Sequence, residues 1–217
     1  MGEQYVGFYW TLPVNWAGFR QLPDDVEAAV QASRTIRYQR EMVRRFVASE
    51  RGILVDEIAF MDVQPDRATE IVREVLQQRA ARYAGKAKLV TVTFDEVHRW
   101  RTNPYLWAAA AGFGIDIRPL SPTPIVIDGV EFNPIEHFST WRKQDQSAKA
   151  RLEYEALQGL HAALAAVPAG KGRWNAMATR LNAENIKTIR GGSWTAENVR
   201  KLVGRVERDR AIAGSGK

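Results

Sequence analysis

The chain has 217 residues, 45% of them hydrophobic, and a formal net charge of +6. This length accommodates one α/β domain of ordinary size and a small appendage. The absence of cysteine excludes disulfides and cysteine-based zinc sites. The three histidines, His98, His137 and His161, are too scattered for a ligand cluster. We expect neither a metal ion nor a cofactor. We expect a cytoplasmic protein, since no apolar run approaches the roughly 20 residues of a membrane-spanning helix and Met1–Val14 lacks the order of a signal peptide.

The first 133 residues alternate predicted strands with predicted helices. Short aromatic, apolar or β-branched runs bounded by turn residues predict strands at Gln4–Trp10, Ile53–Met61, Lys88–Phe94, Ile115–Arg118 and Ile125–Phe132. Helical spacing and capping signals predict helices from Asp24 or Asp25 to Glu50, over Arg67–Tyr83 and from Asn103-Pro104 to Gly112. This alternation predicts an α/β fold with a mostly parallel sheet and helices on both faces.

A single long helix is predicted to follow, from Asn133-Pro134 to about Val167. It carries a partial apolar stripe of Leu152, Leu157, Leu160, Leu164 and Val167. We expect a homodimer that forms through this helix and the α/β domain. Pro168–Gly172 is typical of a linker, so we place the domains at 1–133, 134–167 and 168–210, with a disordered tail at 211–217.

The stretch from residue 173 to residue 203 predicts two short amphipathic helices around a basic turn. Helical spacing relates Trp174, Met177, Ala178 and Leu181 in the first helix, and Val199, Leu202, Val203 and Val206 in the second. Gly191-Gly192 permits a positive φ in the turn, and Thr195 is well placed to cap the second helix.

The net positive charge is concentrated in this C-terminal part. Residues 168–217 hold 11 Lys and Arg against four Asp and Glu, whereas the other 167 residues hold 20 against 21. A positive field on one small module attracts a polyanion and releases counterions on contact, which is how phosphate backbones are bound. We expect double-stranded DNA as the partner, and neither a membrane nor a small-molecule substrate. The alternative is a basic face that is merely solvated. The candidate DNA-binding residues are Arg173, Lys187, Thr188, Arg190, Gly191, Gly192, Ser193, Trp194, Thr195, Asn198, Arg200, Lys201 and Arg205.

Two local motifs and the order of elements resemble the serine recombinase (resolvase/invertase) family. Leu181–Thr195 is similar to the family's segment Leu-Asn-x-x-Gly-Ile-x-Thr-x-Arg-Gly-Gly-x-Trp-Thr, with Asn185 where a glycine is usual. Three shorter matches lie nearer the N-terminus. Tyr5-Val6 falls on the family's first strand, and Thr35–Arg40 resembles the Ser-x-x-x-Gln-Arg start of the family's first helix. Asp95–Arg99 resembles the family's Asp-Arg-Leu-x-Arg motif. The resemblance implies a resolvase-like α/β domain, a long connecting helix and a helix-turn-helix-like DNA-binding domain.

The same resemblance implies that the catalytic motif is lost. The family needs a serine nucleophile two residues after an arginine on the first strand, but these positions here are Gly7 and Tyr9. In the later motif Glu96 replaces the first arginine, while Arg99 retains the second. Arg67 corresponds only loosely to another phosphate-binding arginine. We therefore infer that strand exchange by the family mechanism is lost and assign no catalytic residue beyond the weak candidates Tyr9 and Arg99.

Other residues with catalytic chemistry have simpler interpretations. Ser33 and Ser139 are possible displaced nucleophiles, but each lies in a predicted helix and neither has an Arg-x-Ser arrangement. His98 is a possible general base, although a lone histidine at a strand end is more often a surface residue. The aspartate pairs Asp24-Asp25 and Asp62/Asp66 suggest magnesium, but helix capping and turn formation explain both pairs.

We therefore expect a sequence-specific DNA-binding protein of a bacterium or mobile element, associated with the nucleoid, that acts as a transcriptional regulator or an architectural factor. Two alternatives remain open. One is an active recombinase or nuclease with a displaced nucleophile, and the other is a protein-interaction adaptor.

Overall fold

The structure is a computed structural model that describes residues 2–14, 17–61, 68–94 and 104–214. It divides into two compact units, Met1–Thr140 and Trp141–Lys217, which are described separately below as unit 1 and unit 2.

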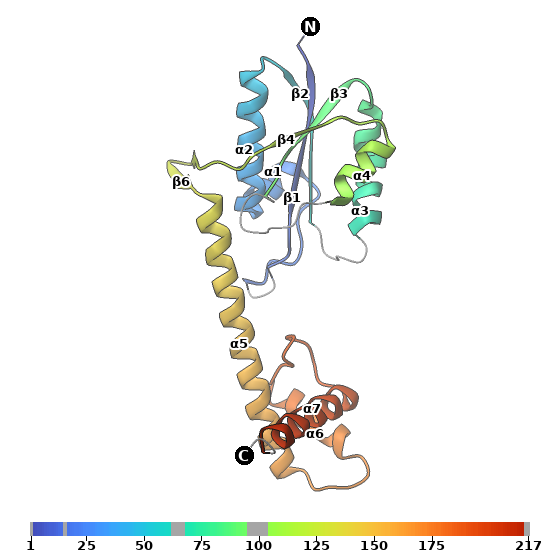
Figure 1. Ribbon diagram of the computed structural model, residues 1–217, viewed down its shortest axis with the longest axis vertical. Helices are drawn as coiled ribbons and strands as arrows, with labels where there is room; N and C mark the ends of the chain where they lie inside the picture. The colour runs from blue at the N-terminus through green and yellow to red at the C-terminus, as the bar shows by residue number, and fades with distance from the viewer. Residues whose placement is uncertain (1, 15–16, 62–67, 95–103, 215–217) are drawn as a thin grey trace. The chain divides into compact units, whose positions relative to one another are not determined.

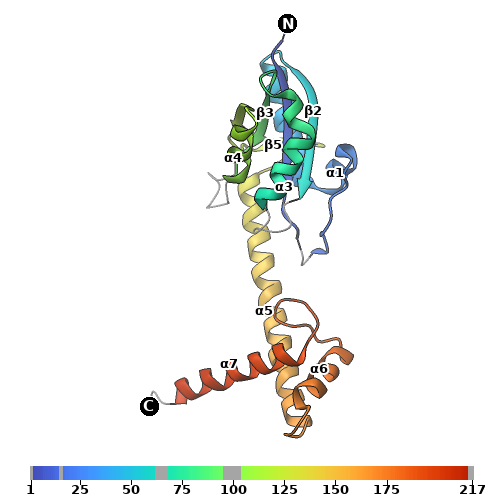
Figure 2. The same cartoon turned by 90° about the vertical axis from the view of Figure 1, so that its right-hand side faces the viewer.

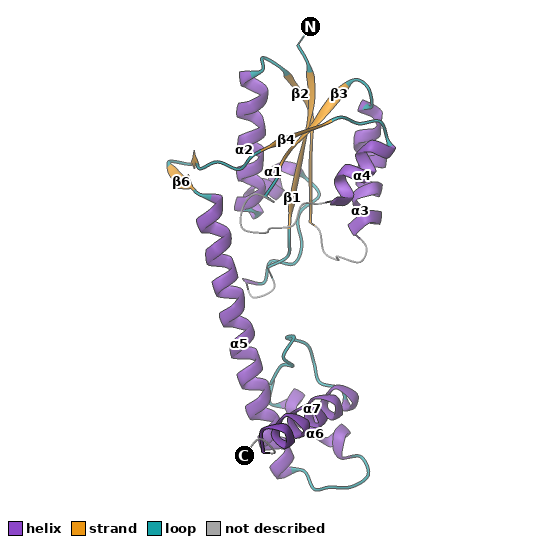
Figure 3. Ribbon diagram, in the orientation of Figure 1, coloured by secondary structure: helices purple, strands orange, loops and turns teal. Residues whose placement is uncertain are grey.

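Unit 1 is built on a parallel sheet of four strands (Figures 1 and 3). Its strands are β1 (Gln4–Thr11), β2 (Ile53–Met61), β3 (Ala87–Val92) and β4 (Ile117–Leu120), in the order β2-β1-β3-β4. The side chains of β1 are buried from Tyr5 to Thr11, as expected for a strand covered on both faces. The predicted α/β class and parallel sheet are confirmed.

Helices cover both faces of this sheet (Figure 1). One face carries α1 (Val26–Ala32) and α2 (Arg34–Ser49), and the other carries α3 (Ala68–Val75) and α4 (Pro104–Gly112). After α3 the chain continues as a π-helical turn, Leu76–Ala80, and a 3-10 turn, Ala81–Tyr83. The core on the α1–α2 face includes Tyr5, Tyr9, Val30, Ile36 and Val43.

The single helix predicted between Asp24 and Glu50 is wrong, because Ser33 interrupts it. Ser33 adopts an extended conformation, with φ −132° and ψ 114°, and its hydroxyl accepts a hydrogen bond from the Ile36 amide at 3.3 Å. A serine side chain that bonds to nearby backbone favours a helix start over a helix interior. Asp25 caps α1 as predicted, since its carboxylate accepts from the Ala28 amide at 2.8 Å.

The single strand predicted over Ile125–Phe132 is also wrong. This segment forms an antiparallel hairpin of β5 (Ile125–Ile127) and β6 (Val130–Phe132), which is separate from the parallel sheet. Asp128 and Gly129 both have positive φ, 51° and 77°, as a two-residue hairpin turn requires. An ion pair between Asp128 and Arg37 of α2 fastens the turn to unit 1.

Unit 2 is a bundle of helical segments. The long helix α5 (Pro134–Ala166) is confirmed; it begins in unit 1, and its greater part packs in unit 2 with α6 (Arg173–Ala183) and α7 (Ala196–Gly214) (Figure 2). The shared core contains Ala156, Leu160 and Ala163 of α5, Met177, Ala178 and Leu181 of α6, and Trp194, Val199, Leu202 and Val203.

This core changes the interpretation of the long helix. Leu160 is fully buried within the chain, and Leu157, Leu164 and Val167 pack against the same core. The stripe therefore serves unit 2 itself instead of remaining open for a second copy. The division between the units falls inside α5, whereas the sequence interpretation placed it at the linker Pro168–Gly172.

The predicted disordered tail at 211–217 is corrected in part, since α7 extends to Gly214. None of the helices in the described ranges has an apolar stretch long enough to cross a membrane.

Candidate nucleic-acid interface

The segment between α6 and α7 is held by two side chains, Asn182 and Trp194. The Asn182 amide donates to the Trp194 carbonyl at 2.9 Å and accepts from the Trp194 backbone N–H at 2.8 Å. The Trp194 ring is part of the core, 4% exposed, and its Nε1 donates to the Ile186 carbonyl at 3.0 Å. Trp194 was predicted to contact DNA, but the structure makes it the residue that fastens the turn to the core.

Helix α6 ends in a left-handed residue. Asn185 has φ 56°, the Asn185 amide donates to Asn182 O at 3.0 Å, and the Ile186 amide donates to Leu181 O at 2.9 Å. This bonding pattern is the Schellman motif, in which glycine is the preferred left-handed residue and asparagine the next best. The asparagine at a position where the resembling segment has glycine is therefore compatible with this backbone.

The basic turn is closed by Thr188. Its amide donates to Gly192 O at 2.9 Å, its hydroxyl accepts from the Gly192 amide at 3.0 Å, and its carbonyl accepts from the Gly191 amide at 2.7 Å. Gly191 has φ 80°, so the predicted positive φ is confirmed there. Lys187, Arg190, Gly191, Gly192 and Ser193 are all exposed on this ordered turn.

The start of α7 is capped reciprocally. The Thr195 hydroxyl accepts from the Asn198 amide at 3.2 Å, and the Asn198 side-chain oxygen accepts from the Thr195 amide at 2.8 Å. The predicted cap at Thr195 is confirmed. Asn198 also donates from Nδ2 to the Ser193 carbonyl at 3.4 Å, so its position is fixed relative to the turn.

The predicted DNA-binding cations fall into three groups. Lys187, Arg190 and Arg200 are exposed, and no described carboxylate lies within 4 Å of them. Lys201 pairs with Glu197 at 2.8 Å, and Arg205 pairs with Glu153 at 3.7 Å.

Arg173 forms the third group and is structural. It is half-buried, its guanidinium donates to the Leu164 carbonyl at 3.0 Å, and it lies 5.7 Å from the Trp174 ring centre. Arg173 therefore supplies a hydrogen-bond donor to a backbone carbonyl at the C-terminal end of α5, and it is a poor candidate for DNA contact.

The list of candidates omitted two exposed cations of α6 and α7. Arg180 is exposed on α6, where it pairs with Glu184 at 2.9 Å, and Arg208 is exposed on α7. Both occupy polar positions between the apolar stripes of the predicted helices, and that periodicity could have identified them.

The two units differ sharply in charge. Unit 2 holds 15 Lys and Arg against seven Asp and Glu, a net charge of +8, whereas unit 1 holds 16 against 18, a net charge of −2. The positive field therefore belongs to the whole of unit 2, including its part of α5.

In unit 1, Tyr9, at the position that the sequence resemblance aligns with a serine nucleophile, is buried. A Cβ on Gly7 would lie 2.7 Å from the Tyr9 Cζ and closer still to its hydroxyl, so the ring needs the glycine two residues earlier. The Tyr9 hydroxyl donates to Glu57 Oε1 at 2.8 Å. Burial raises the pKa of Tyr9 well above its usual value, and the Glu57 carboxylate raises it further, so Tyr9 keeps its proton at neutral pH.

The arginines near Tyr9 are neutralised by carboxylates. Arg40, which is almost fully buried, binds Glu57 at 2.9 Å and also pairs with Glu27, while Arg44 binds Glu57 at 2.9 Å. Burial alone would raise the pKa of Glu57, but hydrogen bonds from Arg40 and Arg44 lower it below its ordinary value. These arginines are thus engaged within the fold.

Gln39, the other member of the Gln-Arg pair in the resembling segment, also has a structural role. Its side chain accepts from the Trp10 amide at 3.1 Å and donates to the Trp10 carbonyl at 2.7 Å, which fastens α2 to the end of β1.

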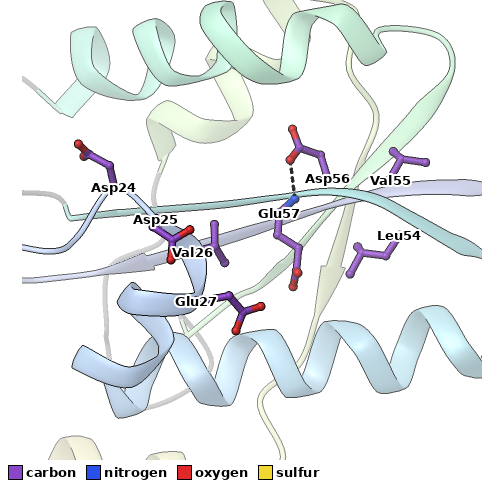
Figure 4. A pocket seen from close by; sticks show the side chains of 8 residues that line it. All are labelled: Asp24, Asp25, Val26, Glu27, Leu54, Val55, Asp56 and Glu57. Carbon is purple, nitrogen blue, oxygen red and sulfur yellow. Dashed lines mark hydrogen bonds between the residues drawn. The ribbon is translucent and has the colours of Figure 1, made fainter.

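A pocket of about 370 Å³ opens beside this network (Figure 4). It is lined by Asp24, Asp25, Val26, Glu27, Leu54, Val55, Asp56 and Glu57. Three of its five carboxyl groups are paired with arginines, Glu27 and Glu57 with Arg40 and Asp56 with Arg82, so the arginines that approach the pocket are already engaged. Within the described ranges no group of three or more histidine or carboxylate side chains is arranged to hold a metal ion.

The remaining catalytic candidates are structural or undescribed. Ser33 caps α2, and the Ser139 hydroxyl donates to the Glu136 carbonyl at 3.0 Å. The other residues that the sequence analysis considered for catalysis, phosphate binding or magnesium binding lie outside the described residues. They are Asp62, Asp66, Arg67, Glu96, His98 and Arg99.

Comparisons of the chain with protein-family models, with curated proteins and with solved structures found no match.

Proposed function

We propose that this chain is a sequence-specific DNA-binding protein in which unit 2 binds the duplex and unit 1 does not cut it. The observation that carries the proposal is a set of three exposed cations, Lys187, Arg190 and Arg200, on a hydrogen-bonded turn and the helix that follows it. None of them has a carboxylate partner among the described residues. Exposed cations on an ordered backbone, in a unit of net charge +8, favour binding to a phosphate backbone.

The arrangement of α6, turn and α7 supports a helix-turn-helix-like mode of binding. In this mode α7 is the recognition helix and enters the major groove with its N-terminal residues. Ser193, Thr195 and Lys201 then contact base edges or phosphates, while Arg190 and the backbone of Gly191-Gly192 approach a phosphate. The hydrogen bonds of Thr195 and Asn198 would hold the turn and the start of α7 in a fixed position relative to each other.

The resemblance to serine recombinases, together with the chemistry of unit 1, supports a resolvase-like scaffold without strand exchange. Tyr9 is buried, protonated and paired with a carboxylate, and the pocket beside it is acidic. A bacterial, nucleoid-associated regulator or architectural factor is the role that this combination favours. We also propose a homodimer, formed through unit 1, since most of the α5 stripe packs within unit 2.

The first test replaces the three unpaired cations together. The variant Lys187→Ala/Arg190→Ala/Arg200→Ala should bind duplex DNA more weakly, and the slope of log affinity against log salt should become shallower by up to about 2.7, or 0.9 per lost phosphate contact. Fluorescence anisotropy with a labelled duplex measures both. Lys86→Ala, which removes an exposed cation of unit 1, is the matched control and should leave both quantities unchanged. An equal loss in both variants would contradict the assignment.

The second test concerns cleavage. Supercoiled plasmid incubated with the protein, with and without magnesium, should stay intact and carry no covalent protein adduct. Nicked plasmid or a protein–DNA adduct would instead support an active recombinase or nuclease.

A further inference from the structure

Three cations of unit 2 lie beside glutamates. Arg180 is 2.9 Å from Glu184, Lys201 is 2.8 Å from Glu197, and Arg205 is 3.7 Å from Glu153. The first two pairs each span one helical turn, at the end of α6 and at the start of α7, whereas the third joins α7 to α5. All six side chains are well exposed, at 43 to 70%.

Folding gives only a modest reason for these glutamates, chiefly at Glu197, which lies in the first turn of α7, where a carboxylate favours the helix start. Exposed ion pairs contribute little to stability, since water screens them and the long side chains lose freedom when they pair. The hydrogen bond from Lys201 lowers the pKa of Glu197, so this carboxylate stays charged throughout the neutral range. Each of the three glutamates places a carboxylate beside a cation on the more basic unit of the chain.

We infer that Glu184, Glu197 and Glu153 limit the affinity of unit 2 for DNA of arbitrary sequence, an inference that rests on the proposed function. Binding to arbitrary DNA depends on cations that neutralise phosphates. A cation that already has a carboxylate partner must leave it to bind a phosphate, and the carboxylate then repels that phosphate. Lys201 and Arg205 thus contribute less to indiscriminate binding than the unpaired Lys187, Arg190 and Arg200.

The same charges have a use in selectivity. A glutamate can accept a hydrogen bond from cytosine N4, and a lysine or arginine can donate to guanine, so base contacts in a cognate site compensate for the broken pairs. An arbitrary sequence offers no such compensation. Selectivity is a difference between two affinities, and lowering the non-specific one increases it.

The test uses Glu197→Gln and Glu184→Gln in the full chain, with a duplex of random sequence. Each variant should bind several-fold more tightly than the wild type at low salt, with a salt slope steeper by up to about 0.9, because one further cation becomes available to phosphate. Glu153→Gln should act in the same direction, with a smaller effect because its pair is longer. Thermal unfolding of each variant checks that the fold is retained.

Two controls separate this inference from general charge effects. Glu197→Asp retains the charge and should bind like the wild type. Glu41→Gln breaks an equivalent pair of unit 1, Glu41–Arg45 at 2.7 Å, and should leave DNA affinity unchanged. If the wild type binds DNA but the Gln variants keep its affinity and slope, the inference is overturned while the proposed function stands. If the wild type binds no duplex, both are overturned.

Discussion

At the scale of single residues, Gly7 and Tyr9 act as a pair. The glycine leaves the space that the Tyr9 ring fills, and the ring brings its hydroxyl to Glu57. These are the two positions at which the resembling family carries its arginine and serine. In this chain the two positions form part of a packed core, in which Tyr9 donates a hydrogen bond to Glu57.

Removing the Tyr9 hydroxyl tests this structural role. Tyr9→Phe should lower the free energy of unfolding by about 2 kcal/mol, because a hydrogen bond to a charged group is lost inside the core. Urea denaturation measures the loss, and DNA affinity should not change. Tyr154→Phe, at a position that is 65% exposed, is the control and should be neutral. Equal stability of the two variants would rule out a structural role for the Tyr9 hydroxyl.

Single residues also show what the sequence could predict. The caps at Asp25 and Thr195 and the positive φ at Gly191 follow from local side-chain chemistry, which the sequence displays directly. The burial of Trp194 does not follow from local chemistry, because a tryptophan beside a basic turn has the same local sequence pattern whether its ring faces DNA or the core. Which cations have carboxylate partners likewise depends on the folded structure, as the Arg205–Glu153 pair shows.

At the scale of elements, the close packing of unit 2 depends on Gly159 of α5. A Cβ at this position would lie 2.6 Å from Ile186 Cδ1 and 3.1 Å from Leu181 Cδ2. Glycine in a helix interior normally costs about 1 kcal/mol relative to alanine. Here it allows α5 to approach the end of α6, which fixes the start of the basic turn.

This close approach predicts a reversal of the usual effect of alanine. Gly159→Ala should destabilise unit 2 by about 1 to 2 kcal/mol, since the new methyl group overpacks the contact. Hydrogen exchange of the α6 and α7 amides measures the local stability. Ile186→Val removes the nearest atom and should recover part of the loss in the double variant.

Gly112→Ala provides the matched control, because no heavy atom lies within 4 Å of its added Cβ. This variant should leave unit 2 unaffected. Faster exchange in Gly112→Ala than in Gly159→Ala would contradict the packing argument.

The element boundaries show where sequence patterns were sufficient. The sequence pattern, an apolar run with its flanking proline, predicted β1, α4 and α5 almost to the residue, since each is a long or well-bounded run. It failed at Ser33 and at Asp128-Gly129, where one or two residues with local hydrogen-bonding or turn chemistry override a longer apolar pattern. Both signals were present in the sequence but were outweighed by the apolar residues around them.

At the scale of the whole molecule, charge and chemistry are divided between the two units. Unit 1 carries an acidic pocket and internally paired arginines, and unit 2 carries the net positive charge with unpaired cations on an ordered turn. The sequence placed the charge correctly at the C-terminal end. It could not show that α5 belongs to the same charged unit, because the buried contacts of Ala156, Leu160 and Ala163 arise only in the folded chain.

The most direct test of this account is the salt dependence of duplex binding by the full wild-type chain. If at least three cations neutralise phosphates, log affinity should fall against log salt with a slope of about −2.7 or steeper, and binding should be readily detected at low salt. Absence of binding to any duplex at about 50 mM salt, where such contacts are strongest, would contradict the account.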